Sequence, residues 1–256
     1  MVEPASARAT TVLSTVALSK SFGGLAAVRD VTLDLAPGEL HAVIGPNGAG
    51  KSTLVNLLSG ELAPSSGRIL LTGADVTHLP VHRRVHLGVA RSFQRTNIFP
   101  SLSMLENARL AVQATAQAGL FPLTPARSAT ALMDGAVAAL ARAGLTDGHR
   151  RIAGTLAHGQ QRQLEIAMAL ASRPKVLLLD EPLAGMGPEE GERMASLLKS
   201  LALDLAILLI EHDMDFVFKV ADRMTVMVEG TVLASGKPAE LRANPAVQAA
   251  YLGGAA

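Results

Sequence analysis

A glycine-rich stretch carries the strongest chemical signal in this sequence. Residues 45 to 53 read Gly-Pro-Asn-Gly-Ala-Gly-Lys-Ser-Thr, the phosphate-binding pattern in which Gly and four further residues precede Gly-Lys-Ser/Thr. In such a loop successive backbone amides point at one phosphate, and the following helix adds the positive end of its dipole. Lys51 would contact the β- and γ-phosphates, and Ser52 would ligate the accompanying Mg²⁺. Rather than a glycine-rich surface turn, we predict a nucleoside triphosphate site formed by Gly45, Pro46, Asn47, Gly48, Ala49, Gly50, Lys51, Ser52 and Thr53.

Two later apolar runs end in side chains that could act on such a nucleotide. The run 176–179 is followed by Asp180 and Glu181, and the run 205–210 is followed one residue later by His212. Because ligands of parallel sheets bind at the carboxyl ends of the strands, these side chains should lie beside the phosphate loop. We expect Asp180 to bind the metal, directly or through water, Glu181 to act on the attacking water, and His212 to hold the γ-phosphate or steer that water. Taken singly, each of these side chains could have a purely structural role. Their joint placement after apolar strands predicts that the chain hydrolyses the nucleotide rather than only binding it.

Two side chains outside these motifs are further candidates. Gln94 follows an expected strand at 88–93, and its amide could contact both the metal and the attacking water. Phe22 lies upstream of the phosphate loop in a chain with 3% aromatic residues; its ring could stack on adenine, and a core position is the alternative. His82 and His86 share a face of an expected helix, but without a glutamate between them or a third ligand a solvated basic face is favoured over a zinc site.

Apolar patterning indicates which elements must position these residues. Two or three strands are expected between positions 12 and 35, and the phosphate loop lies between an apolar run at 41–44 and a helix that ends near residue 60. An alanine-rich helical segment at 104–143 is typical of a lobe inserted into an α/β domain. The remaining expectations are strands at 68–71, 176–179 and 205–210, helices at 161–172, 188–201 and 246–252, and a hairpin at 224–235.

Composition narrows the class of protein. The 256 residues suffice for one large α/β domain or a domain with a lobe. The 23 basic and 22 acidic side chains leave a net charge of +1, which gives no electrostatic case for a nucleic-acid partner. The absence of cysteine excludes disulfides and thiolate metal sites, which agrees with a reducing, cytoplasmic location. The longest dense apolar runs are far shorter than the ~20 residues that cross a bilayer, and a secretory signal is not expected at the start.

In order and spacing, these motifs resemble those of the ATP-binding subunits of ATP-binding cassette (ABC) transporters. The resemblance covers nearly the whole chain and adds a signature-like stretch formed by Leu156, Ala157, His158, Gly159 and Gln160. It implies an α/β fold with a P-loop NTPase core, an antiparallel β subdomain and an inserted helical lobe. It further implies ATP and Mg²⁺ as cofactors, Phe22 as the adenine-stacking residue, and Ser52, Gln94 and Asp180 as metal contacts. A single domain at 12–253 is expected, with the lobe at roughly 95–172 and residues 1–11 disordered.

The resemblance also implies a partner for the nucleotide site. Such subunits pair head to tail, so that ATP lies between one phosphate loop and the other subunit's signature. A helix beginning near Gly159 would offer free amides to that second anion. Two departures from the family pattern stand out: the usual Leu-Ser-Gly-Gly-Gln has Ala157 and His158 at its second and third positions, and Gly187 replaces an expected aspartate. Both departures favour pairing of this chain with a different ATPase subunit, and a homodimer is the alternative.

Finer details are similar to the ATPase subunits of branched-chain (hydrophobic) amino acid importers. These details are the stretches 22–28, 91–94, 97–99, 157–161, 184–186 and 244–253. They imply a cytoplasmic subunit, peripheral on the inner face of the plasma membrane, that docks on two permease subunits and is served indirectly by a solute-binding protein, without contacting nucleic acid. The alternatives are the ATPases of urea or amide importers, of lipid or lipopolysaccharide exporters, and a soluble cassette ATPase without a transport role. The last is disfavoured by the single cassette and the lack of heptads.

Overall fold

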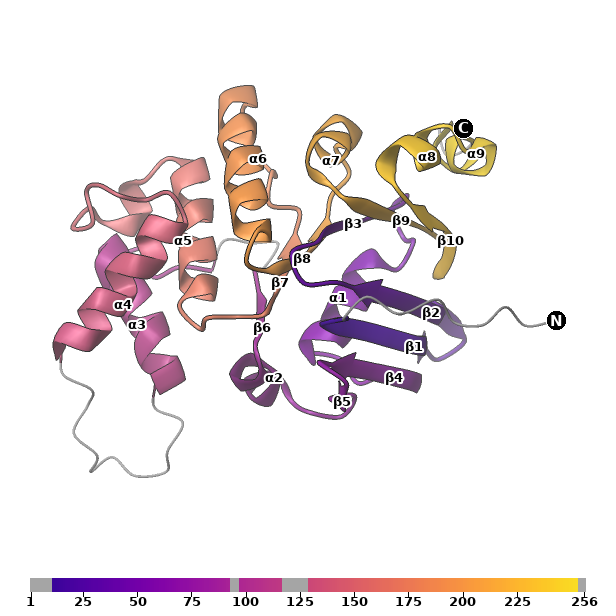
Figure 1. Cartoon of the computed structure of the whole chain (residues 1–256), viewed down its shortest axis with the longest axis horizontal. Helices are drawn as coiled ribbons and strands as arrows, with labels where there is room; N and C mark the ends of the chain where they lie inside the picture. The colour runs from indigo at the N-terminus through magenta and orange to yellow at the C-terminus, as the bar shows by residue number, and fades with distance from the viewer. Residues whose placement is uncertain (1–10, 93–96, 117–128, 253–256) are drawn as a thin grey trace.

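The computed structural model describes residues 11–92, 97–116 and 129–252. Within these residues a mainly parallel sheet forms the centre of the molecule, with strand order β10-β9-β3-β8-β7-β6 (Figure 1). Its strands are β3 (Leu40–Ile44), β6 (Val89–Arg91), β7 (Val176–Asp180), β8 (Ala206–Ile210), β9 (Arg223–Val228) and β10 (Thr231–Gly236). The pairs from β6 to β9 are parallel, and β10 pairs antiparallel with β9.

A second, antiparallel sheet lies beside the first, with strand order β2-β1-β4-β5. It is formed by β1 (Leu13–Phe22), β2 (Leu25–Leu35), β4 (Ser66–Leu71) and β5 (Ala74–Asp75). The segment expected to hold two or three strands therefore holds two. The antiparallel subdomain implied by the family resemblance is confirmed.

Helix α1 (Lys51–Ser59) is enclosed between the two sheets. Its apolar face, which includes Leu54 and Leu58, packs in one core with residues of both sheets, such as Leu13 of β1 and Leu178 of β7. Each of these four side chains is completely buried. The phosphate loop thus precedes a helix that has no freedom to shift relative to either sheet.

The opposite face of the main sheet is covered by helices, seen at the left and top of Figure 1. Leu177 of β7 and Leu209 of β8 point to this face, while their neighbours Leu178 and Leu208 point to α1. Because successive strand residues alternate between faces that are both covered, every position of these strands is apolar up to the closing Asp180. The helices are α3 (Met104–Ala116), α4 (Ala129–Arg142), α5 (His158–Leu170), α6 (Pro188–Ala202) and α7 (Met214–Val220).

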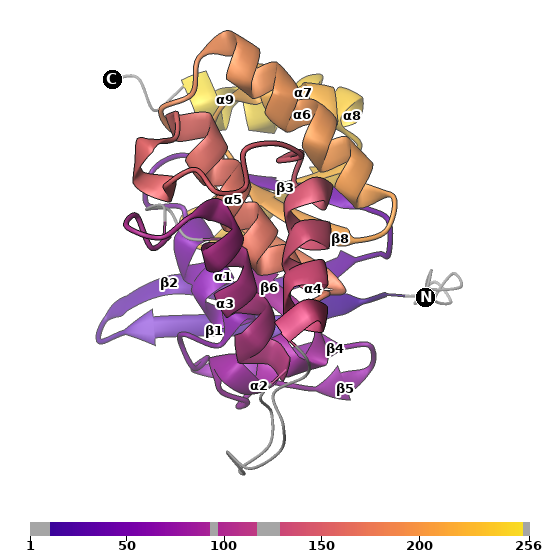
Figure 2. The same cartoon turned by 90° about the vertical axis from the view of Figure 1, so that its left-hand side faces the viewer.

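The remaining short helices complete the fold. The 3₁₀ helix Ala153–Thr155 precedes α5, α2 (Val81–Leu87) precedes β6, and α8 (Pro238–Arg242) and α9 (Pro245–Leu252) follow β10. Figure 2, turned by 90°, shows α3 and α4 in front of the core, and Figure 1 shows α8 and α9 on the opposite side of the molecule. No helix of the described residues combines the length and apolar character that crossing a membrane requires.

Several element boundaries differ from the sequence-based expectation by one to three residues, and two of these differences have a clear local origin. Strand β6 starts at Val89, not Gly88, because Gly88 ends α2 in the left-handed conformation and its amide bonds back to Arg84 and Val85. Helix α5 begins at His158, three residues before the expected start, with Ala157 as an extended N-cap residue.

Arg84 is a fully buried cation that ties α2 to the end of α1. Its guanidinium donates to the backbone carbonyls of Leu57 (2.6 Å), Leu58 (2.8 Å), Thr77 (2.8 Å) and Leu79 (3.0 Å). Burial lowers its pKa to about 10, so the side chain remains charged at neutral pH. Arg84 therefore bonds carbonyls at the carboxyl end of α1, in addition to the Gly60 amide, which donates to the Leu57 carbonyl at 3.2 Å.

We expect Arg84→Met to lower the free energy of unfolding by roughly 2–4 kcal/mol, because buried carbonyls would lose their donor. Denaturant unfolding followed by circular dichroism measures the change. Arg83→Met, at the exposed neighbouring position of the same helix, should alter stability by less than ~0.5 kcal/mol. Equal effects of the two substitutions would contradict the role given to Arg84.

Candidate functional site

The phosphate loop connects β3 to α1 at the carboxyl end of the main sheet. The Lys51 ammonium is folded back over the loop, where it donates to the carbonyls of Gly45 (2.7 Å) and Pro46 (3.0 Å). Burial lowers the pKa of Lys51, and the nearby Glu181 and Asp180 carboxylates oppose that shift. The cation is therefore held at the loop by backbone oxygens and by the two acids at the end of β7.

The loop is shaped by close backbone contact with β2. Gly50 has φ +95°, and a Cβ atom there would lie 2.2 Å from the carbonyl oxygen of Ala27. The Gly230 amide donates to the Ala49 carbonyl at 3.1 Å, so the turn between β9 and β10 also supports the loop. Only glycine meets both requirements at position 50, namely a left-handed backbone and the lack of a side chain.

A cavity of about 810 Å³ runs along the loop between the two sheets. Phe22 lies at its rim with 47% of the residue exposed, so the alternative of a core position for Phe22 is wrong. The Lys20 ammonium is 5.2 Å from the centre of the Phe22 ring. The lining comprises Phe22, Gly24, Leu25, Ala26, Ala27, Arg29, Asn47, Gly48, Ala49, Gly50, Lys51, Ser52, Thr53, Glu181 and Glu229.

Sequence reasoning missed Arg29 and Glu229 in this lining. The Arg29 guanidinium donates to the Glu229 carbonyl at 2.7 Å, and so links β2 to the turn after β9. The two residues are 200 positions apart, and neither belongs to a recognisable motif. No signal in the sequence could have paired them.

The two acids after β7 have different environments. Asp180 is 3% exposed, and burial raises the pKa of its carboxyl group although Arg91 opposes the shift. Glu181 is half-buried and reaches the cavity. It has φ +48°, a left-handed conformation that is uncommon for glutamate.

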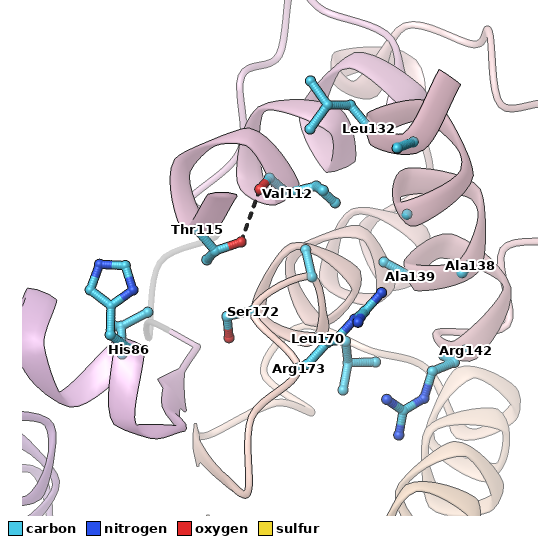
Figure 3. Close-up of a pocket in the computed structure, with 14 residues that line it drawn as sticks. His86, Val112, Thr115, Leu132, Ala138, Ala139, Arg142, Leu170, Ser172 and Arg173 are labelled. Carbon is cyan, nitrogen blue, oxygen red and sulfur yellow. Dashed lines mark hydrogen bonds between the residues drawn. The ribbon is translucent and has the colours of Figure 1, made fainter. Parts of the chain in front are cut away.

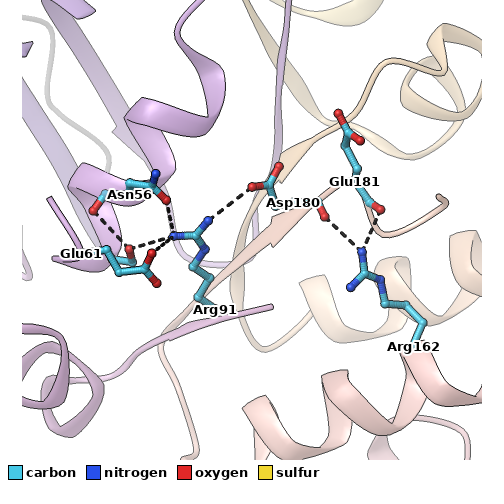
Figure 4. Close-up of polar contacts among 7 residues, drawn as sticks. Asn56, Glu61, Arg91, Arg162, Asp180 and Glu181 are labelled. Carbon is cyan, nitrogen blue, oxygen red and sulfur yellow. Dashed lines mark hydrogen bonds and ion pairs between the residues drawn. The ribbon is translucent and has the colours of Figure 1, made fainter. Parts of the chain in front are cut away.

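Hydrogen bonds hold this unusual backbone in place. The Glu181 amide donates to the Ile210 carbonyl at 2.9 Å, and Arg162 donates to the carbonyls of Asp180 (3.2 Å) and Glu181 (2.9 Å) (Figure 4). Strain that is fixed by its surroundings in this way is typical of functional positions. Arg162, on α5, is a further residue that the sequence did not reveal.

His212 follows β8 and its side chain is 68% exposed. Its Nδ1 atom lies 3.9 Å from Glu181 Oε1 and 3.6 Å from Glu211 Oε2. Glu211 is completely buried, and its carboxylate accepts from the amides of Leu183 and His212, each at 3.0 Å. Burial raises the pKa of Glu211. No motif in the sequence marks Glu211, yet it joins the segment after Glu181 to the segment that carries His212.

The signature-like residues lie away from the phosphate loop of the same chain. Ala157, Gly159 and Gln160 line a separate cavity beside α6, whereas Leu156 is buried and the side chain of His158 packs against Gly185. The Gly159 amide, expected to be free, donates to Glu190 Oε1 at 3.2 Å. That expectation is therefore wrong for this amide, because the first turn of α6 supplies an anion from within the chain.

The oxygen donors near the loop fit a magnesium ion that is shared with a nucleotide. Ser52 is exposed in the cavity and Asp180 lies at the end of β7, whereas Gln94 lies outside the described residues. Across the described part of the chain no group of three or more His, Asp or Glu side chains is arranged to hold a metal. A hydroxyl and a carboxylate are oxygen donors of the kind that Mg²⁺ takes, an ion that keeps several waters and binds through one or two protein oxygens together with phosphates.

Comparison with known proteins gives a consistent result. Residues 28–184 match the family described as ABC transporter, and residues 231–256 match the family described as branched-chain amino acid ATP-binding cassette transporter. The high-affinity branched-chain amino acid transport ATP-binding protein LivG of Escherichia coli (strain K12) is 41% identical over 249 residues, covering 94% of this chain and 98% of LivG.

Two solved structures have the same fold. The ADP conformation of MJ1267, an ATP-binding cassette of an ABC transporter, superposes with a TM-score of 0.84 at 28% identity, covering 95% of this chain and 99% of that one. The dimeric structure of MJ0796, a bacterial ABC transporter cassette, superposes with a TM-score of 0.75 at 25% identity, covering 88% of this chain and 98% of that one.

Substitution of two loop glycines separates steric from conformational effects. Gly50→Ala should destabilise the folded chain by more than ~2 kcal/mol, because the new methyl group would overlap the Ala27 carbonyl. Gly48→Ala is the matched control. Its backbone is also left-handed, with φ +80°, but no atom lies within 4 Å of the position that the new methyl group would take. We therefore expect Gly48→Ala to cost only about 1 kcal/mol of folding stability. Thermal unfolding without nucleotide compares the two variants, and equal losses would contradict the importance of the β2 contact.

Proposed function

Because the chain belongs to the ABC transporter family, we propose that it is the ATP-hydrolysing subunit of an importer for branched-chain amino acids or a related small solute. The shared cavity of Lys51 and Glu181 carries the hydrolytic part of this proposal. The likeness of the whole chain to LivG, together with the match at 231–256, supports the solute class. We assign the domain to residues 12–253, with the helical lobe at roughly 95–172.

In this proposal each residue around the cavity has its own role in ATP hydrolysis. The loop amides and Lys51 bind the phosphates, and the ring of Phe22 at the rim offers a stacking surface for adenine. Ser52 and Asp180, with Gln94, would hold Mg²⁺, which spreads the negative charge that develops on the phosphates. Glu181 orients the attacking water and accepts its proton, while His212, 3.9 Å from Glu181, contacts the γ-phosphate.

The separate position of the signature residues supports a dimer. Ala157, Gly159 and Gln160 cannot serve the phosphate loop of their own chain, so we propose that they face the nucleotide of a second ABC ATPase subunit. Without a serine at 157 or an aspartate at 187, a different ATPase subunit is the partner that would best complete both sites. Separation of such a dimer would accompany the loss of the γ-phosphate.

A groove between the core and the helical lobe is our proposed docking site for the permease. Its cavity of about 310 Å³ lies between α2, α3, α4 and the end of α5, and Figure 3 shows His86 facing side chains such as Thr115 from the opposite side. Arg173 gives it positive charge, to which Arg142 adds although its NH2 atom lies 3.8 Å from Asp204 Oδ2, and this charge suits an acidic segment of the partner. Strand β6 follows α2 directly and ends three positions before Gln94, so a partner here could respond to the nucleotide site. Docking would place the subunit on the cytoplasmic face of the membrane.

Glu181→Gln tests the catalytic assignment. We expect steady ATP hydrolysis to fall at least 100-fold, about 3 kcal/mol in activation free energy, because the amide cannot accept the proton of the attacking water. ATP binding, measured by equilibrium titration, should be retained. Glu229→Gln is the matched control, since Glu229 lines the same cavity but should leave turnover within about twofold. Undiminished turnover in Glu181→Gln would remove the assignment.

Ala138→Glu tests the docking groove. Ala138 is an exposed lining residue, so a carboxylate there should repel an acidic partner and reduce co-purification with the permease at least tenfold. Val137→Glu adds the same charge at the adjacent exposed position, which does not line the groove, and should have little effect. If both variants co-purify equally well with the permease, this docking site is refuted. The identity of the permease that is recovered would decide among the importer and exporter alternatives.

A further inference from the structure

One arginine connects the buried acid of the site to the helix that follows the phosphate loop. Arg91 is the last residue of β6, and its side chain is 10% exposed. Its NH2 atom lies 3.3 Å from Asp180 Oδ2, and its NH1 atom lies 2.5 Å from Asn56 Oδ1 and 3.0 Å from Glu61 Oε2. Figure 4 shows the guanidinium between these groups. A single side chain thus joins the end of β7, helix α1 and the residue that follows α1 and its glycine cap.

The chemistry of this contact is specific to arginine. A planar guanidinium donates in several fixed directions, so it can bond Asp180 on one side and Asn56 on the other at the same time. An ammonium group on a shorter chain could satisfy one of these partners, but not both in the same geometry. Because Asp180 is almost fully buried, the cation also offsets the cost of keeping the carboxylate charged.

We propose that Arg91 is a positioning residue for magnesium-dependent nucleotide binding, fixing the Asp180 carboxylate relative to the phosphate-loop helix. This inference rests on the proposed function, in which Asp180 and Ser52 hold the ion together with the phosphates. Ser52 belongs to α1 and Asp180 to β7, so the two metal contacts come from different elements. Arg91 bonds both elements, and it therefore sets the distance at which one ion can meet both oxygens.

The test is the gain in nucleotide affinity that magnesium provides. The dissociation constant of a non-hydrolysable ATP analogue is measured for the full chain with Mg²⁺ and with EDTA. We expect Arg91→Met to reduce the magnesium-dependent gain at least tenfold while affinity in EDTA changes less than threefold, because the loop and Lys51 are intact. The magnesium-dependent gain of Arg91→Lys should lie between those of Arg91→Met and the unsubstituted chain. If Arg91→Met shows the same magnesium-dependent gain in affinity as the unsubstituted chain, the proposal is overturned.

A double-mutant cycle excludes a merely structural role. Asp180→Asn should lose the same magnesium-dependent gain, and adding Arg91→Met to it should cause no further loss if Arg91 acts through Asp180. Glu61→Gln keeps an acceptor for Arg91, so it should retain the gain within about twofold. Additive losses from the two substitutions would refute the positioning role. Should Arg91→Met fail to fold, Arg91→Lys carries the same cycle.

The failures of the two proposals are distinguishable. If the unsubstituted chain shows no magnesium-dependent binding of the analogue, the proposed function itself fails. If the unsubstituted chain shows that gain and Arg91→Met keeps it, only the role of Arg91 fails. Thermal unfolding of each variant without nucleotide confirms that the binding measurements refer to folded protein.

Discussion

The enclosure of α1 between two sheets is the constraint on which the rest of the site depends. A phosphate loop is useful only if its amides keep their direction, and that direction is set by the helix that follows. Leu54 and Leu58 are completely buried against strands from both sheets, so the helix cannot tilt without opening a core. Both sheets therefore contribute to the phosphate site, although the loop itself lies in only one connection between a strand and a helix.

Arginines supply the polar counterpart of that packing. Arg84 satisfies the carbonyl end of α1, Arg91 joins the side of α1 to Asp180, and Arg162 holds the backbone that carries Glu181. Arg84 and Arg162 are buried and Arg91 is nearly so, in surroundings where a charged group is stable only with several well-placed acceptors. Each therefore specifies a geometry that an apolar side chain of similar size could not. The site is positioned as much by these cations as by its apolar core.

Two carboxylates from the second half of the chain have comparable roles outside the cavity. Glu211 bonds the amides of Leu183 and His212, and so fixes the segment after Glu181 against the segment after β8. Glu190 bonds the Gly159 amide at the start of α5 and the Gly187 amide at the start of α6. An incoming phosphate at the start of α5 would meet this carboxylate, so the anion-binding character of that helix end depends on where Glu190 lies.

Local chemistry determined much of this protein directly from the sequence. The loop at 45–53, the all-apolar strands ending at Asp180 and before His212, and the helices of the lobe follow from patterns within a few residues, because backbone preference and burial on both faces act over that range. Tertiary structure alone decided that Phe22 lies at the rim of the cavity and not in the core, that Gly159 bonds Glu190, and that Arg29, Arg91 and Glu211 join the site. Arg29, Arg91 and Glu211 look like ordinary charged positions in the sequence. Their roles arise from partners tens to hundreds of positions away, and only the packing of the two sheets and the helices brings such partners within hydrogen-bonding distance.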